Sequence, residues 1–144
     1  RRAPLSLVLD SSATLSWCFA DECTPAATRL LRRIAESGAL VPALWRLEVA
    51  NGLLVAVRRG RITKQQRDST LRDLRQLAIA ADPETDDHAW TAALQLADRF
   101  GLTVYDAAYL ELARRRRMPL ATLDRPLRQA AVALAVELWG PNDG

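Results

Sequence analysis

The sequence from Leu102 to Ala113, LTVYDAAYLELA, provides the reference around which the rest of the chain can be placed. A short extended segment leads to Asp106, and the residues after it are typical of a helix. Because an aspartate oxygen can accept a hydrogen bond from a backbone N–H of the first turn, we expect Asp106 to be the N-cap. Tyr109, Leu110 and Ala113 follow at spacings typical of one buried helical face. The stretch therefore predicts a core helix that begins beside an acidic residue.

On both sides of this helix, short apolar runs alternate with amphipathic stretches. We expect strands over Leu5–Leu9, Ala39–Val41, Leu120–Leu123 and Val136–Leu138, and a further short strand within Leu77–Ala81. This alternation predicts an α/β sandwich with a mostly parallel sheet. The sequence shows no repeat, no low-complexity segment and no linker, so we expect residues 1–144 to form a single domain.

The helices are indicated by capping residues and by apolar faces. The first helix is opened by Ser11, Ser12 and Thr14 and carries Leu15, Trp17, Cys18 and Phe19. The second helix follows Thr24-Pro25, has Ala27, Leu30, Leu31 and Ile34 on one face, and stops at Gly38. The third starts at Pro42 and ends at Gly60, and the fourth follows a capping box at Thr63–Gln66. The fifth predicted helix is capped by Asp86 or Asp87, buries Trp90, Leu94 and Ala97, and ends at Gly101. The helix of Asp106 follows and ends in Arg114–Arg117. Asp124 caps the last helix.

The composition is that of an ordinary globular protein with a mild net charge of +3. Every basic residue except Lys64 is arginine, which suits phosphate recognition, although a genome rich in G and C gives the same bias. Cys18 and Cys23 do not make a disulfide framework, which favours a reducing cytoplasm. Asp10 interrupts the first apolar run, and no stretch approaches the roughly 18 apolar residues of a membrane span. We therefore expect a cytosolic chain.

Two acids stand at the ends of predicted strands. Asp10 ends the first strand, and Asp124 comes directly after Leu120–Leu123. In an open parallel sheet, ligands bind at the carboxyl ends of the strands. An aspartate in this position is also a common helix cap, so a structural role and a functional role are equally open for each of the two.

Glu48 is the stronger indication of a site. Its predicted helix, Leu44–Val57, is apolar nearly all round, which indicates that the helix is buried. Asn51 lies on the same helical face as Glu48, whereas Arg46 lies on another. Because a buried carboxylate needs a partner or a metal ion, we expect Glu48 to point toward the edge where Asp10 and Asp124 emerge.

If Asp10, Glu48, Asp106 and Asp124 meet, they repel one another, since two unit charges 4 Å apart cost about 4 kcal/mol at an effective dielectric near 20. Such a cluster takes up protons or binds a divalent cation. A set of oxygen ligands without histidine or thiolate favours Mg²⁺ or Mn²⁺, whose natural substrate is a phosphodiester or a phosphoryl group. Ser12 and Thr122 either orient these carboxylates or are local caps.

Two other classes of acidic α/β site are excluded. A phosphatase of the haloacid-dehalogenase type has a general acid two residues after the first aspartate, and here that position is Ser12. A response-regulator receiver has a lysine after its last strand, whereas Lys64 is the only lysine of this chain. His88 stands at a helix start and is expected to be a surface residue.

With these positions assembled, the chain resembles the PIN-domain family, and within it the VapC-type toxin ribonucleases. The matching segments are Val8–Ser12, Trp17–Glu22, Leu47–Asn51, Thr103–Ala113 and Thr122–Leu127, and they run in the family order over nearly the whole chain. The resemblance implies a PIN-like three-layer α/β/α sandwich with a short, mostly parallel central sheet. It implies a divalent-metal-dependent endoribonuclease, Mg²⁺ or Mn²⁺ as cofactor, and Asp10, Glu48, Asp106 and Asp124 as the metal-site acids.

The resemblance also implies an RNA substrate, a homodimer and a cognate antitoxin protein as partner. Trp17, Phe19 and Trp45 are either core residues or the floor of a groove that takes an antitoxin segment. The arginines of 114–117 and of 58–61 either complement the ends of their helices or bind RNA phosphates. Two alternative functions stay open: a PIN nuclease of housekeeping RNA processing without antitoxin, and a PIN-like module that binds RNA or protein without cleavage.

Overall fold

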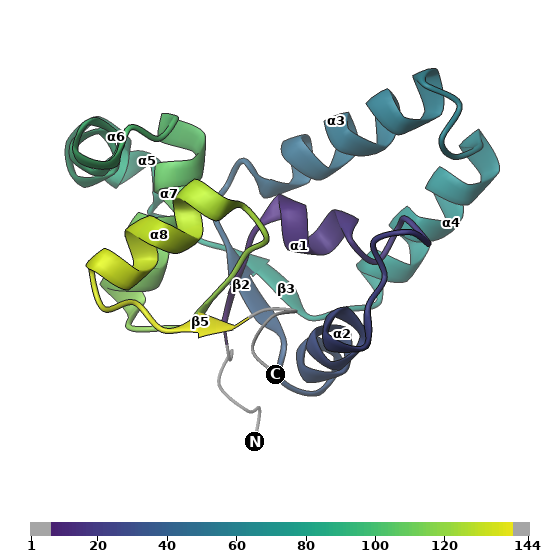
Figure 1. Ribbon diagram of the computed structural model, residues 1–144, viewed down its shortest axis with the longest axis horizontal. Coiled ribbons are helices and arrows are strands. Elements are labelled where there is room, and N and C mark those ends of the chain that lie inside the picture. The colour runs from purple at the N-terminus through teal and green to yellow at the C-terminus, as the bar shows by residue number, and fades with distance from the viewer. Residues whose placement is uncertain (1–6, 140–144) are drawn as a thin grey trace.

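The computed structural model describes residues 7–139 and contains a central five-stranded sheet with helices on both sides (Figure 1). The strands are β1 (Val8–Leu9), β2 (Ala39–Val41), β3 (Ile79–Ala81), β4 (Leu120–Ala121) and β5 (Leu138–Trp139). They pair in the order β3-β2-β1-β4-β5, and every pair is parallel. The predicted α/β/α sandwich is confirmed, with a sheet that is parallel throughout.

The helices divide into two layers. Figure 1 shows α1 (Ser11–Leu15), α2 (Pro25–Ser37), α3 (Trp45–Arg58) and α4 (Lys64–Arg75) on one side of the sheet. The other side carries α5 (Thr85–His88), the π-helical turn η1 (Ala89–Ala93), α6 (Leu94–Phe100), α7 (Val104–Arg116) and α8 (Arg125–Ala133). The chain winds from β1 outward to β3 and then crosses back to β4, so the winding reverses between β1 and β4. In doubly wound sheets this switch point is where ligands bind.

The core lies where β1 and β4 meet α7. Val8, Leu9, Leu120 and Ala121 have no exposed surface, because helices cover both faces of a parallel sheet. The part of α7 from Ala107 to Ala113 is also buried, including the predicted inward residues Tyr109, Leu110 and Ala113. In the described part of the chain, no helix is long and apolar enough to cross a membrane.

Several predicted helix ends are confirmed. Thr24 accepts a hydrogen bond from the N–H of Ala27, Thr63 and Gln66 form a reciprocal capping box, and Asp124 accepts from the N–H of Leu127. Gly38 and Gly101 end α2 and α6 with positive φ angles of 71° and 65°. At these sites the sequence pattern and the local backbone requirement coincide.

Strand β2 spans the predicted Ala39–Val41 and β3 lies within the predicted Leu77–Ala81, whereas the bounds of the other three strands and of two helices differ from the prediction. The first strand begins at Val8; Leu5 and Ser6 of the predicted range lie outside the described residues. The last two strands cover Leu120–Ala121 and Leu138–Trp139, because only these residues pair in register with the neighbouring strands. Helix α1 ends at Leu15, so the aromatic residues after it lie in turns. Helix α3 begins at Trp45, since the N–H of Trp45 bonds to the carbonyl of Pro42 in a preceding turn.

Two predicted N-caps are wrong. Thr103, not Asp106, caps α7, and its hydroxyl accepts a hydrogen bond of 3.1 Å from the N–H of Asp106. Asp106 therefore lies inside the first turn, with its side chain free of the capping role. Asp86 and Asp87 also lie inside a first turn, because α5 begins at Thr85. The side chain of Asp82 organises that turn instead, accepting from the N–H of Glu84 and the hydroxyl of Thr85.

The helix around Trp90 does not bury the predicted face. Ala97 is buried, but Trp90 is 90% exposed and Leu94 is 44% exposed. The π-helical turn η1 has more residues per turn than an α-helix, so the 3.6-residue period used in the prediction does not hold across it.

Helix α3 is likewise only partly buried. Val49, Leu53 and Ala56 face the core, whereas Leu47 is 76% exposed and Asn51 is exposed. The predicted all-round burial of this helix is wrong: apolar composition alone did not reveal which side meets the sheet.

Candidate active site

Asp10 is the most deeply buried acid of the site. It follows β1 at the centre of the sheet, is 3% exposed, and caps α1 by accepting from the N–H of Ala13 at 2.9 Å. Its carboxylate also accepts from the hydroxyls of Ser12, at 2.7 Å, and of Thr122. Burial raises the pKa of Asp10 to about 6, against the lowering effect of these three hydrogen bonds.

Ser12 and Thr122 connect the ends of β1 and β4. The hydroxyl oxygen of Ser12 accepts from the N–H of Leu123 at 3.0 Å, and that of Thr122 accepts from the N–H of Asp124 at 3.0 Å. Because the same two hydroxyls donate to Asp10, they set the position of Asp10 relative to the start of α8, where Asp124 lies. Both contacts agree with the orienting role proposed from the sequence.

Glu48 reaches the same edge from the first turn of α3. It is half-buried, and its Oε1 accepts a hydrogen bond of 2.5 Å from the hydroxyl of Tyr109. Burial raises the pKa of Glu48, the bond from Tyr109 opposes this, and the nearby charge of Asp106 adds to the rise. Burial likewise raises the pKa of the Tyr109 hydroxyl, which stays a hydrogen-bond donor at neutral pH.

Asp106 is electrostatically central among the four acids. Burial and the charge of Asp124 raise its pKa, and its own charge raises the pKa values of Asp10 and Glu48. None of these four residues, called the acid cluster below, forms a salt bridge with another residue of the range 7–139. Within residues 7–139, negative charge is thus concentrated at the switch point of the sheet, and no salt bridge to these four acids balances it.

The donor chemistry of the acid cluster fits a hydrated Mg²⁺ or Mn²⁺ ion. All its donors are carboxylate oxygens, which these hard cations prefer. Among the residues described, no three acidic, histidine or cysteine side chains are close enough to hold one ion together. Mg²⁺ is usually bound by one or two carboxylates and keeps several waters, so it does not require three protein ligands.

Tyr109 is the residue of this site that the sequence reasoning placed only in the core. Its spacing of three residues from Asp106 on one helical face was the available indication, since such residues are neighbours on a helix. Asn51, by contrast, was proposed to orient Glu48. It is exposed, and no hydrogen bond joins it to Glu48 within the described chain.

The three aromatic residues proposed for a partner groove take mainly structural positions. Phe19 is 7% exposed and lies under the guanidinium of Arg61, 3.8 Å from the ring centroid. Trp45 is 4% exposed, with its indole N–H donating to the hydroxyl of Thr14 at 3.0 Å. Trp17 is half-buried and donates to the carbonyl of Ala27. The core alternative therefore describes Phe19 and Trp45 better than the groove floor does.

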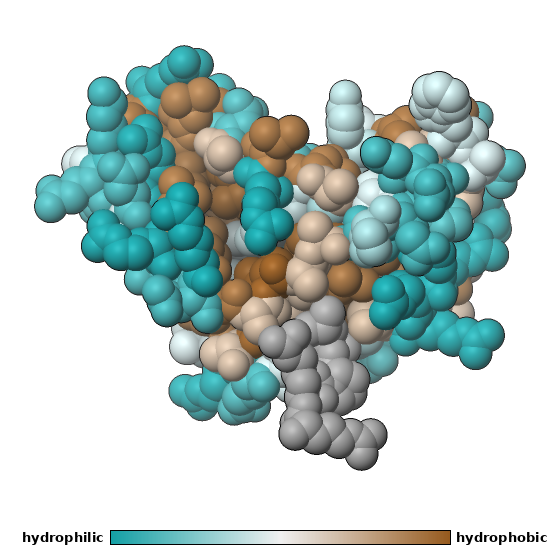
Figure 2. Space-filling view, turned by 180° about the vertical axis from the view of Figure 1, so that it is seen from behind, coloured by the Kyte–Doolittle hydropathy of each residue, from teal (hydrophilic) through white to brown (hydrophobic). Residues whose placement is uncertain are grey.

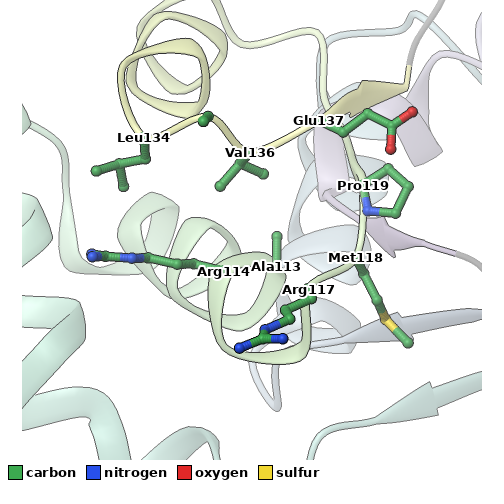
Figure 3. A pocket seen from close by; sticks show the side chains of 9 residues that line it. Ala113, Arg114, Arg117, Met118, Pro119, Leu134, Val136 and Glu137 are labelled. Carbon is green, nitrogen blue, oxygen red and sulfur yellow. The ribbon is translucent and has the colours of Figure 1, made fainter.

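The arginine-rich end of α7 lies away from the acid cluster. Asp106 is in the first turn of α7 and Arg114–Arg117 close it, roughly 12–16 Å farther along at 1.5 Å per residue. Figure 3 shows a pocket of about 290 Å³ at this end, where Leu134 and Val136 face Ala113. This pocket lies before β4 and β5, at the edge of the sheet opposite to Asp10 and Asp124. In the other arginine group, residues 58–61, Arg61 forms salt bridges with Asp21 and Glu22.

Comparisons with known proteins agree with this geometry. The chain is 33% identical over 130 residues to Ribonuclease VapC3 of Pyrobaculum aerophilum, covering 90% of this chain and 98% of that protein. It is similar to the crystal structure of PAE2754 from Pyrobaculum aerophilum, with a TM-score of 0.65 and 25% identity over 88% of this chain and 79% of that one. The fold also resembles a chain of a toxin-antitoxin complex from Klebsiella pneumoniae, with a TM-score of 0.55, 15% identity, and coverage of 83% and 87%. Residues 7–133, which include the whole of the sheet except β5, match the model of the PIN domain. This chain therefore belongs to the PIN-domain family.

Proposed function

We propose that this chain is a divalent-metal-dependent endoribonuclease, that it cleaves RNA phosphodiesters at the acid cluster, and that it acts as the toxin of a toxin–antitoxin pair. The observation that supports this proposal is electrostatic: the charge of Asp106 raises the pKa values of Asp10 and Glu48, and the charge of Asp124 raises that of Asp106. Similarity to Ribonuclease VapC3 supports RNA cleavage as the activity.

The carboxylates would hold Mg²⁺ or Mn²⁺, which neutralises a phosphate and lowers the pKa of an attacking water when bound. Asp10 already accepts three hydrogen bonds, two on Oδ1 and one on Oδ2. A carboxylate has about four acceptor sites, so about one is left for an ion. Asp106 has no capping bond to give up, because Thr103 caps α7. These two residues are therefore suited to bind the ion directly.

The activity is tested with single-stranded RNA in the presence of Mg²⁺ or Mn²⁺, with and without chelator. Glu48→Gln should lower the cleavage rate by more than about 100-fold, beyond the usual effect of losing a supporting residue. Glu36→Gln, on the exposed side of α2, is the matched control and should leave cleavage unchanged. Equal rates for a folded Glu48→Gln protein and the wild type would rule out the acid cluster as the catalytic site.

For the antitoxin we propose an apolar segment docked beside α3. Helices α3 and α4 enclose a pocket of about 340 Å³ whose apolar lining comes from Trp45, Val49, Leu71, Leu74, Leu77 and Ile79. Seen from behind, hydrophobic side chains form a band between hydrophilic flanks (Figure 2). Trp45 is a core residue, 4% exposed, that also lines this pocket, whereas Trp17 and Phe19 do not line it. An arginine or lysine of the partner reaching the acid cluster would block metal binding by a charge-assisted bond.

We further propose that the chain is a single nuclease domain, that it works as a homodimer, and that it acts in the cytoplasm. Trp90 and Leu94 are 90% and 44% exposed and are four residues apart, and an exposed apolar pair of this kind favours a protein interface. The two cysteines are free, as expected in a reducing compartment. Co-purification of the native protein with an inhibitor would favour a toxin over a housekeeping nuclease, and cleavage itself excludes a pure binding module.

A further inference from the structure

The contact between Tyr109 and Glu48 joins two helices at the acid cluster. Tyr109 lies on α7 and is 1% exposed, whereas Glu48 lies on α3 and is half-buried. The tyrosine hydroxyl donates to Oε1 of Glu48 at 2.5 Å. A bond to a charged acceptor at this distance is among the stronger hydrogen bonds of proteins.

The Glu48 carboxylate needs such a bond to stay in place, because its surroundings favour movement of the side chain away from the acid cluster. Its side chain is only half-buried, and the charge of Asp106 acts against the ionised carboxylate. Two neighbouring carboxylates repel each other when both are ionised. Tyr109 follows Asp106 by one helical turn, so its hydroxyl draws Glu48 toward the same helix whose Asp106 repels it.

Two of the other acids, Asp10 and Asp124, are held by bonds of their own. Asp10 accepts from Ser12, Ala13 and Thr122, and Asp124 accepts from the N–H of Leu127. For Glu48 the bond comes from Tyr109, with Ser11 close enough to contribute a second.

We propose that Tyr109 is a positioning residue, which holds the Glu48 carboxylate at the acid cluster by donating its hydroxyl proton to Oε1 and so keeps this carboxylate available to a hydrated divalent cation. This inference rests on the proposed function, since it assigns to Tyr109 a part in building the metal site. It differs from a purely structural role, in which Glu48 only satisfies a buried hydroxyl that would otherwise lack a partner.

The first test compares two substitutions that each remove one oxygen from the same helix. Tyr109→Phe keeps the ring in the core and deletes the hydroxyl. Tyr105→Phe is the matched control, because the only other tyrosine of the chain is 65% exposed and lies one residue before Asp106. Binding of Mn²⁺ alone, without RNA, is measured by calorimetry. We expect Tyr109→Phe to weaken binding about 10- to 100-fold, the usual effect of losing a residue that supports a metal ligand, and Tyr105→Phe to leave it unchanged.

The second test asks whether Tyr109 acts through Glu48. Tyr109→Phe is introduced into a Glu48→Gln protein, and the Mn²⁺ affinities of the four variants are compared as a double-mutant cycle. A positioning residue should add little or no further loss once Glu48 is neutral. RNA cleavage by Tyr109→Phe should recover toward the wild-type rate at saturating Mn²⁺, because the hydroxyl orients a ligand and does not touch the reacting atoms.

Two results would overturn the inference while the proposed function stands: wild-type Mn²⁺ affinity in Tyr109→Phe, or an equal further loss in the Glu48→Gln background. A wild-type protein that neither binds Mn²⁺ nor cleaves RNA would overturn the proposed function, and the inference with it. Circular dichroism and denaturant unfolding of Tyr109→Phe separate a loss of stability from a loss of metal affinity.

Discussion

Asp10 serves two purposes at once: its side chain caps α1, and its carboxylate faces the acid cluster. Burial raises its pKa to about 6 from 3.8, so the folded protein retains a proton there that the unfolded chain releases. Ionisation of Asp10 is therefore unfavourable to the metal-free fold.

We predict that the metal-free protein loses stability through Asp10 as the pH rises from about 4 to about 6. At 1.36 kcal/mol per pKa unit the loss is of the order of 3 kcal/mol. Urea unfolding of the wild type and of Asp10→Asn across this range, in chelator, measures it. The stability difference between the two proteins should change with pH, and parallel pH profiles would contradict the assignment.

A second buried network lies on the opposite side of α7. Arg115 donates to Asp82 at 2.6 Å and to Glu111 at 2.8 Å, and the side chains of the two acids are 0% and 7% exposed. Burial alone would raise the pKa of Asp82, but its bonds to Arg115 and to the N–H of Glu84 hold the pKa below the ordinary value. The network joins the turn after β3 to α7.

Arg115→Met should destabilise the fold by about 3–5 kcal/mol, because it leaves buried carboxylates without their cation. Since the pKa of Asp82 is lowered, the contribution of the pair is present near neutral pH and is lost as the pH falls below about 4. The effect of the substitution should therefore shrink in acid, as measured by denaturant unfolding. Glu84→Gln, at the exposed side of the network, should change stability by less than about 0.5 kcal/mol.

At the scale of elements, the start of α7 separates structural from functional residues. Thr103 caps the helix, and Asp106 lies in its first turn among other acids. Thr103→Ala should cost about 1 kcal/mol of stability, whereas Asp106→Asn should leave the metal-free protein as stable or more stable, because it removes repulsion. Chemical denaturation of both variants in chelator checks this. A larger loss for Asp106→Asn than for Thr103→Ala would make Asp106 the structural residue.

Sequence reasoning succeeded where a local rule controls the backbone. The caps at Thr24, Thr63 and Asp124 depend on residues within one turn, and each was predicted. It failed at Trp90, where a π-helical turn changes the helical period, and along α3, whose exposed side depends on the placement of distant elements. Asp10 and Asp124 were predicted at one edge because each follows a parallel strand, and β1 and β4 do lie side by side. The bond of Tyr109 to Glu48 crosses between helices and was not predicted.

At the scale of the whole molecule, a bound cation should stabilise the fold. A ligand that binds only the folded state adds about 2.7 kcal/mol at a hundredfold excess over its Kd. Melting curves with and without Mg²⁺ or Mn²⁺ should show a rise in Tm for the wild type that is absent in the Asp10→Asn/Asp106→Asn protein. An equal rise in both proteins would place the ion elsewhere.

The proposed homodimer is tested through its most exposed apolar groups. Trp90 and Leu94 are one helical turn apart and exposed, so Trp90→Ser/Leu94→Ser should shift the protein toward monomer in sedimentation velocity. Val132→Ser, at an exposed position on α8, is the control and should not change the sedimenting mass. An unchanged mass for the double variant would place any dimer interface on another surface.

The central position of β1 also bears on how the enzyme is made. Its two residues can pair with β4 only after more than a hundred further residues have been made, and the bond from Thr122 to Asp10 closes a separation of 112 positions. Closing so long a loop comes late in folding. A nascent chain that has not yet reached β4 lacks Asp124 and the hydroxyl that orients Asp10, and it holds β1 with one side unpaired. If RNA is cleaved at the acid cluster, as we propose, a nascent chain cannot cut the message that encodes it before β4 and Asp124 have been made.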